Sequence, residues 1–174
     1  MSSIVADPDV EVIPTNEDGF VILGPDDKPV NVDGSDGLDV IQTGDETDDV
    51  SGGDGDDVAL GGAGDDQITG DQGDDVVLGG EGNDNLIIGP GSDVAIGGPG
   101  NDTFTFEFFD DAPDIITEFK SGEDRIVIPG VSDQTNVTYD SITGELKVDG
   151  QTIAQLSSGL DVEINHTDEG FEIL

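Results

Sequence analysis

The chain has no cysteine and no tryptophan, and it holds one histidine among 174 residues. Without cysteine, disulfide bonds cannot hold the fold together, and there is no thiol nucleophile. The single histidine, His166, excludes a HExxH zinc site, which needs two. A GxSxG nucleophile motif is also missing. The sequence therefore predicts a protein that is not an enzyme, with His166 as a surface residue among acidic neighbours.

Basic residues are almost as scarce. Lys28, Lys120, Arg125 and Lys147 oppose 42 acidic residues, which leaves a net charge of −38. Such a chain repels nucleic acid and anionic membranes and attracts multivalent cations. No apolar run approaches the roughly 18 residues of a membrane span. The first residues also lack the basic and apolar segments of a Sec signal peptide.

What the chain does have is a repeat of nine residues. Eight consecutive units run from Gly34 to Thr105, and the clearest read GGDGDDVAL (52–60) and GGAGDDQIT (61–69). A disordered acidic tract would not need aspartate at such a strict interval, although we expect disorder when no cation is present. Every unit has aspartate at position six: Asp39, Asp48, Asp57, Asp66, Asp75, Asp84, Asp93 and Asp102. Every unit has an apolar residue at position eight: Ile41, Val50, Ala59, Ile68, Val77, Leu86, Ala95 and Phe104.

These units resemble the calcium-binding GGxGxDxUx repeat of the RTX, or hemolysin-type, family. The resemblance is close over 34–105 and looser beyond it. It implies an all-β fold, with a parallel β-roll of nonapeptide repeats followed by a β-rich C-terminal cap. Two units would form one coil, so that unit n stacks on unit n+2. The sequence supports this period of 18 independently, because odd units end in apolar triplets such as Val58–Leu60 and even units in mixed ones such as Gln67–Thr69.

Gly-rich turns with carboxylates suit a hard cation, and Ca²⁺ takes 6–8 oxygens at about 2.3–2.6 Å. The smaller octahedral shell of Mg²⁺ fits less well. We expect the position-six aspartates to supply carboxylates and the glycines at positions two and four to supply carbonyls. Those glycines are Gly53, Gly55, Gly62, Gly64, Gly73, Gly80, Gly82, Gly89, Gly91, Gly98 and Gly100.

The sequence leaves two roles open for a further set of acidic residues. Asp54, Asp56, Asp65 and Asp74 either bind the ion or only raise the local negative potential. The turns in 34–51 are degenerate, so that they either bind calcium poorly or serve as an N-terminal cap.

Segments of another character flank the repeats. Residues 1–33 form a predicted extended or capping segment, with candidate strands at 20–23 and 30–32. Residues 106–174 form the predicted cap. Its candidate strands are 103–108, 114–119, 125–128, 137–139, 145–148, 152–155 and 162–164. The junction is expected to be packed by Phe104, Phe106, Phe108 and Phe109.

Two stretches of the cap add to the resemblance. Residues 113–130 resemble the stretch that closes RTX rolls in secreted proteins. Residues 168–174 resemble an uncleaved type I secretion signal, although a last strand of the cap would look the same.

The sequence thus favours a secreted, extracellular protein whose roll folds on binding several calcium ions, with the type I secretion machinery as a partner. Two alternatives stay open. One is an adhesion or matrix component that uses the roll as a spacer, and the other is a detached secretion or folding module for an enzyme encoded elsewhere. The aliphatic outer face of the odd units is expected to be covered, either by the N-terminal strands or by a second copy in a homodimer.

Overall fold

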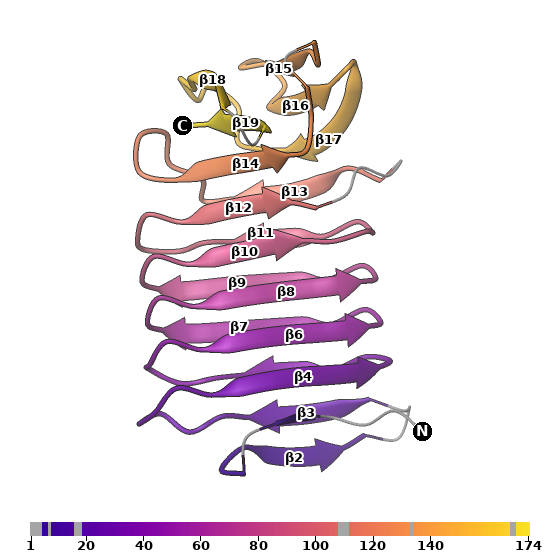
Figure 1. Cartoon of the computed structure of the whole chain (residues 1–174), viewed down its shortest axis with the longest axis vertical. Coiled ribbons are helices and arrows are strands. Elements are labelled where there is room, and N and C mark those ends of the chain that lie inside the picture. The colour runs from indigo at the N-terminus through magenta and orange to yellow at the C-terminus, as the bar shows by residue number, and fades with distance from the viewer. Residues whose placement is uncertain (1–4, 7, 16–18, 108–111, 133, 168–169) are drawn as a thin grey trace.

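The computed structural model describes residues 5–6, 8–15, 19–107, 112–132, 134–167 and 170–174. Over these residues the chain forms strands and no helix, so nothing described is a helix that could cross a membrane. Two sheets face each other and rise together from the N-terminal end to the C-terminal end (Figure 1). This is the all-β roll that the repeat predicts.

We name the two sheets after the units that build them. The ten-stranded odd sheet has, in spatial order, β15 (Val137–Tyr139), β16 (Glu145–Val148), β17 (Gln151–Gln155), β13 (Asp114–Thr117), β11 (Val94–Ile96), β9 (Val76–Glu81), β7 (Val58–Ala63), β5 (Val40–Gln42), β3 (Phe20–Leu23) and β2 (Glu11–Pro14). The nine-stranded even sheet has β1 (Val5–Ala6), β4 (Asn31–Asp36), β6 (Asp49–Asp54), β8 (Gln67–Gln72), β10 (Asn85–Ile88), β12 (Thr103–Phe106), β14 (Arg125–Pro129), β19 (Gly170–Ile173) and β18 (Ile164–Thr167).

The strands of the repeat pair in parallel with a shift of 18 residues. Val58 of β7 lies beside Val76 of β9, which lies beside Val94 of β11. On the even sheet, Ile68 of β8 lies beside Leu86 of β10. Unit n therefore stacks on unit n+2, as predicted. The position-eight residues of all eight units are buried, at no more than 3% exposed, and form the core between the sheets.

The parallel stack is longer than the nonapeptide sequence. Strands β3 and β4 precede it, and β13 and β14 continue it in the same register. Their inward residues extend the core at both ends: Ile22, Val32, Ile116 and Ile126. Because β3 pairs edge to edge with β5, it lengthens the odd sheet and does not cover its outer face. The expectation that N-terminal strands cover that face is wrong.

Antiparallel strands lie at both ends of the stack. At the N-terminal end β2 pairs with β3 and β1 with β4. At the C-terminal end β19 pairs with β14 and with β18, while β16 joins β15 to β17. Residues 170–173 are thus a strand of the cap. On the odd sheet β17 first adds to β13 in parallel, and the antiparallel strands β16 and β15 follow. The antiparallel strands that end both sheets interrupt the repeating edge on which another chain could add.

Glycine is required where the turns of successive coils touch. Gly82 has a φ of 143°, which side chains rarely adopt. A Cβ on Gly82 would lie 1.7 Å from the carbonyl oxygen of Gly64, one coil earlier. Any side chain here would push the coils apart.

The aromatic junction has formed as expected for the residues that the structure describes. Phe104 and Phe106 are buried, and the ring of Phe104 lies 6.2 Å from that of Phe119. Phe108 and Phe109 lie outside the described residues. His166 is exposed, and the centroid of its ring lies 5.0 Å from that of Phe171, with the two rings in an edge-to-face arrangement.

Candidate metal-binding turns

The position-six aspartates form two buried ladders, one along each edge of the roll. In each ladder, a backbone N–H donates to the Oδ1 of the aspartate one coil later. Asp57 N–H donates to Asp75 Oδ1 at 2.7 Å, and Asp66 N–H donates to Asp84 Oδ1 at 2.9 Å. Hydrogen bonds to a carboxylate are stronger than neutral ones. Each carboxylate therefore joins its own coil to the preceding coil.

The second carboxylate oxygen, Oδ2, has different surroundings from Oδ1 in the middle of the roll. It is buried and receives no hydrogen bond from any described residue. This holds for the Oδ2 atoms of Asp57, Asp66, Asp75, Asp84 and Asp102. Burial of a charged oxygen without a partner costs free energy. A divalent cation at each of these oxygens would remove that cost, so the residues fit a metal.

The pKa values of these carboxyls show the same imbalance. Burial raises the pKa of Asp57, Asp66 and Asp84 to about 6 and that of Asp75 to about 7. The N–H donated to each carboxylate opposes this rise, and neighbouring aspartates add to it by repulsion. Burial likewise raises the pKa of Asp102. Holding these groups ionised near neutral pH thus calls for a nearby positive charge.

Backbone atoms of the Gly-rich turns make up most of the surroundings of these carboxylates. In the units that begin with glycine, the carboxylate folds over that glycine, so that a Cβ on Gly79 would lie 2.2 Å from Asp84 Oδ2. At positions two and four, the carbonyl oxygens of one turn stand against the glycines of the next, as Gly62 does against Gly80. Among the described residues, no three acidic, histidine or cysteine side chains gather at one point. A cation here would accordingly take much of its shell from the backbone.

The two degenerate turns differ from the middle ones. Asp39 Oδ2 accepts the N–H of Ser35 at 2.7 Å and its hydroxyl at 3.1 Å. Asp48 Oδ2 accepts the N–H of Gly44 at 3.1 Å. The structure therefore places both residues in the ladders, but with a protein donor on the second oxygen.

The ladders also contain two aspartates that the repeat does not include. Asp114 Oδ1 accepts the N–H of Asp93 at 2.9 Å, and Asp124 Oδ1 accepts the N–H of Asp102 at 3.0 Å. Both are buried. The signal was present in the sequence, since each aspartate stands two residues before an inward isoleucine, Ile116 or Ile126.

The additional acids lie outside the ladders. Asp54, Asp56, Asp65 and Asp74 are exposed. Asp56 Oδ1 accepts the N–H of Asp74 at 3.0 Å, and Asp65 Oδ1 accepts the N–H of Asn83 at 2.7 Å. These side chains form a second, exposed ladder beside the buried one and add to its negative potential.

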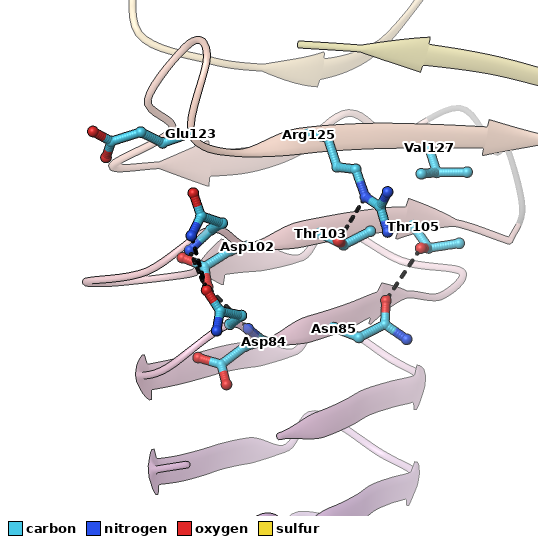
Figure 2. A pocket seen from close by; sticks show the side chains of 10 residues that line it. Asp84, Asn85, Asp102, Thr103, Thr105, Glu123, Arg125 and Val127 are labelled. Carbon is cyan, nitrogen blue, oxygen red and sulfur yellow. Dashed lines mark hydrogen bonds between the residues drawn. The ribbon is translucent and has the colours of Figure 1, made fainter. Parts of the chain in front are cut away.

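An open groove of about 700 Å³ runs over the even sheet near its C-terminal end. Figure 2 shows Asp84 and Asp102 on neighbouring coils, with Asn85, Thr103 and Thr105 along the strands and Glu123 on the turn before β14. Arg125 Nε donates to Thr103 Oγ1 at 2.9 Å. The groove is lined by amides and hydroxyls with Arg125 and Glu123 near the last coil. No lining residue is a histidine, serine or cysteine.

The protein is thus a parallel β-roll that carries a ladder of buried carboxylates along each edge. The family model described as the RTX calcium-binding nonapeptide repeat matches in four copies, over residues 31–59, 51–86 and 88–111. Residues 31–111 therefore carry RTX calcium-binding nonapeptide repeats. That repeat β-roll is a structural calcium-binding fold.

One solved structure similar to this chain is the solution structure of the AlgE6R3 subunit from the Azotobacter vinelandii mannuronan C5-epimerase. It shares 20% sequence identity with a TM-score of 0.32, and the match covers 79% of this chain and 69% of that one. No curated protein matches the chain.

Proposed function

We propose that this chain is a secreted, non-catalytic protein whose roll folds by binding several calcium ions between stacked turns. The observation that carries the proposal is the row of buried carboxylate oxygens without hydrogen-bond partners. The repeat family supplies the identity of the ion. In this proposal Oδ2 of each middle aspartate and the carbonyls at positions two and four bind the ion.

An extracellular place follows from the affinity expected of such sites. Extracellular calcium modules work at about 10⁻⁴–10⁻³ M, far above free calcium in the cytosol. The chain would remain unfolded inside the cell, in a form suited to export, and would fold outside. The type I machinery is the exporter that we propose, on the resemblance of the C-terminal residues. Their strand β19 would then serve first as part of a signal and afterwards as part of the cap.

The choice of ligands can be tested with a matched pair of variants, Asp75→Ala and Asp39→Ala. Asp75 has an Oδ2 without a hydrogen-bond partner, whereas Asp39 Oδ2 is held by Ser35. We expect Asp75→Ala to lose one bound ion and to need about tenfold more calcium for half-maximal folding, a change of about 1.4 kcal/mol. Asp39→Ala should keep the number of ions. Isothermal titration calorimetry and circular dichroism measure both, and the reverse order would contradict the assignment.

A homodimer through the odd sheet is the partner that we propose. Outward side chains of β7, β9 and β11 form two aliphatic rows, only half-buried: Val58, Val76 and Val94, and Leu60, Leu78 and Ile96. Contiguous apolar surface on a soluble protein usually has a partner. A second copy suits this face because the rows carry no charge, so two chains of −38 can approach here without opposing carboxylates.

The double variant Val76→Asp, Leu78→Asp tests the homodimer. We expect the calcium-loaded protein to fall from dimer to monomer, as measured by light scattering after size exclusion. The matched control is Gln67→Asp with Thr69→Asp, the equivalent outward positions of β8 on the even sheet. A monomeric parent protein, or an unchanged mass for the variant of the odd sheet, would exclude this interface.

A further inference from the structure

Apart from the turns of Asp93 and Asp114, the turns of the roll are of two kinds, which differ in the residue four positions before the ladder aspartate. In the open turns that residue has a positive φ and Oδ2 lacks a hydrogen-bond partner. These residues are Gly53 (109°), Gly62 (112°), Asp71 (69°), Gly80 (123°) and Gly98 (108°). In the closed turns, the N–H at the same position donates to Oδ2, as Ser35 does for Asp39 and Gly44 for Asp48.

The last turn of the even edge is also closed. Lys120 stands four residues before Asp124, and its N–H donates to Asp124 Oδ2 at 2.8 Å. Because Arg125 pairs with Thr103, Lys120 occupies the place in this coil that Gly98 occupies in the preceding one. The degenerate sequence of the closing stretch therefore retains the same turn position, with a lysine instead of glycine.

The side chain of Lys120 reaches back to the preceding coil. Its Nζ donates to the carbonyl oxygen of Gly98 at 2.8 Å. Gly98 is the position-two residue of the turn of Asp102, and its carbonyl is one of the oxygens assigned above to a cation. Lys120 also acts on Asp102 itself, since its charge opposes the rise in the pKa of that carboxyl.

The other basic side chains of the protein are placed differently. Lys28 pairs with Asp9, Lys147 with Glu145 and Arg125 with Glu172. Those are ion pairs with surface carboxylates, which contribute little free energy. Lys120 instead presents its ammonium to a backbone carbonyl within the stack of turns.

We propose that Lys120 is a tethered cation that completes the last turn of the roll without calcium. Its ammonium binds the carbonyl of Gly98, and its backbone N–H binds the second oxygen of Asp124. With Ser35 and Gly44 closing turns at the other end, calcium is confined to the open turns between them. In the last of these open turns, that of Asp102, the carbonyl of Gly98 binds the ammonium instead of an ion. The inference rests on the proposed function for the open turns, and it adds that the ends of the roll are independent of metal.

Hydrogen exchange of the full chain in excess chelator tests this proposal. In the parent protein, amides of residues 114–128 should stay protected, while those of residues 52–105 exchange freely. In Lys120→Met, which keeps the stem and the backbone N–H but not the charge, protection of 114–128 should be lost. The calcium concentration at half-maximal folding should rise roughly threefold to tenfold, as expected for loss of a charge-assisted hydrogen bond that is partly open to solvent.

Two control variants separate the charge of Lys120 from other effects. Lys147→Met makes the same change in net charge at a partly buried ion pair of the cap, and it should behave as the parent. Lys120→Arg keeps the cation and should restore protection. If Lys120→Met fails to fold even in saturating calcium while Lys120→Arg folds, the requirement for a cation at this position is supported.

The outcomes that overturn the inference differ from those that overturn the proposed function. Equal protection of residues 114–128 in the parent and in Lys120→Met would show that the ammonium does not complete the turn. If residues 114–128 of the parent show no protection in chelator, the last coil needs metal and the inference is wrong. The proposal that the roll folds on binding calcium would still stand. Protection of residues 52–105 in chelator would contradict the proposed function itself.

Discussion

In excess chelator the chain should lose most of its β signal in far-ultraviolet circular dichroism, and millimolar calcium should restore it. The physical reason is the arrangement of charge. Within the stack, aspartates of successive coils are buried one above another, and the Oδ2 atoms of five of them accept no hydrogen bond from any described residue. Repulsion between them adds to the conformational entropy lost on folding. The free energy of calcium binding is then the main free energy of folding.

The expected transition is cooperative and falls near 10⁻⁴–10⁻³ M calcium. Magnesium at the same concentration is the matched control, since it prefers a smaller octahedral shell and retains its waters. It should restore little of the signal. A full β spectrum in chelator at neutral pH would show that the roll does not need a cation, and would remove the basis of the proposed function.

Acid should partly replace calcium. The pKa of Asp75 is raised to about 7 and those of Asp57, Asp66 and Asp84 to about 6 in the folded chain, against 3.8 for an ordinary aspartate. A carboxyl with a raised folded pKa favours folding in its protonated form. This contribution is complete below about pH 4 and is lost as the pH rises through 6–7. The metal-free chain should therefore gain β structure as the pH falls from 8 to 5.

Calcium binding should show the opposite dependence on pH. Protons compete for the same oxygens, so the calcium concentration at half-maximal folding should rise as the pH falls through 6–7. Asp75→Asn links the two effects, because it removes a buried charge and also a carboxylate ligand. The variant should be more folded than the parent in chelator at pH 8 and should bind calcium more weakly. A metal-free parent chain that loses structure between pH 8 and pH 5 would contradict the argument.

Most of the roll could be predicted from the sequence because each unit encodes its own turn and strand. Position eight specified the core, and the alternation of apolar and mixed triplets specified a shift of 18 residues. Local periodicity contains this information because every coil has the same neighbours. The ends could not be read in the same way. The N–H groups of Phe20 and Val30 begin the two ladders by donating to Asp39 Oδ1 and Asp48 Oδ1. Their places follow from strand pairing with β5 and β6, and neither residue belongs to a nonapeptide unit.

The same limit applies to the candidate site. The position of each aspartate was visible in the sequence, but the division of labour between its two oxygens was not. Oδ1 joins the coils and Oδ2 faces the proposed ion, and only the register of the stack distinguishes them. Asp124 and Lys120 were missed for a related reason. The stretch that holds them has an offset of 22 residues instead of 18, so that a search for strict periodicity passes over it.

The offset of 18 also limits how such a chain can change in length. Duplicating one full coil, such as residues 70–87, adds one strand to each sheet and leaves every later residue on its own side. Duplicating a single unit of nine residues exchanges the sides of everything that follows. The aliphatic outward rows would then continue into the polar face, and the last coil would meet its cap on the wrong edge. Tandem duplication can thus lengthen this protein only in whole coils, and the smallest viable insertion in the repeat is twice the repeat itself.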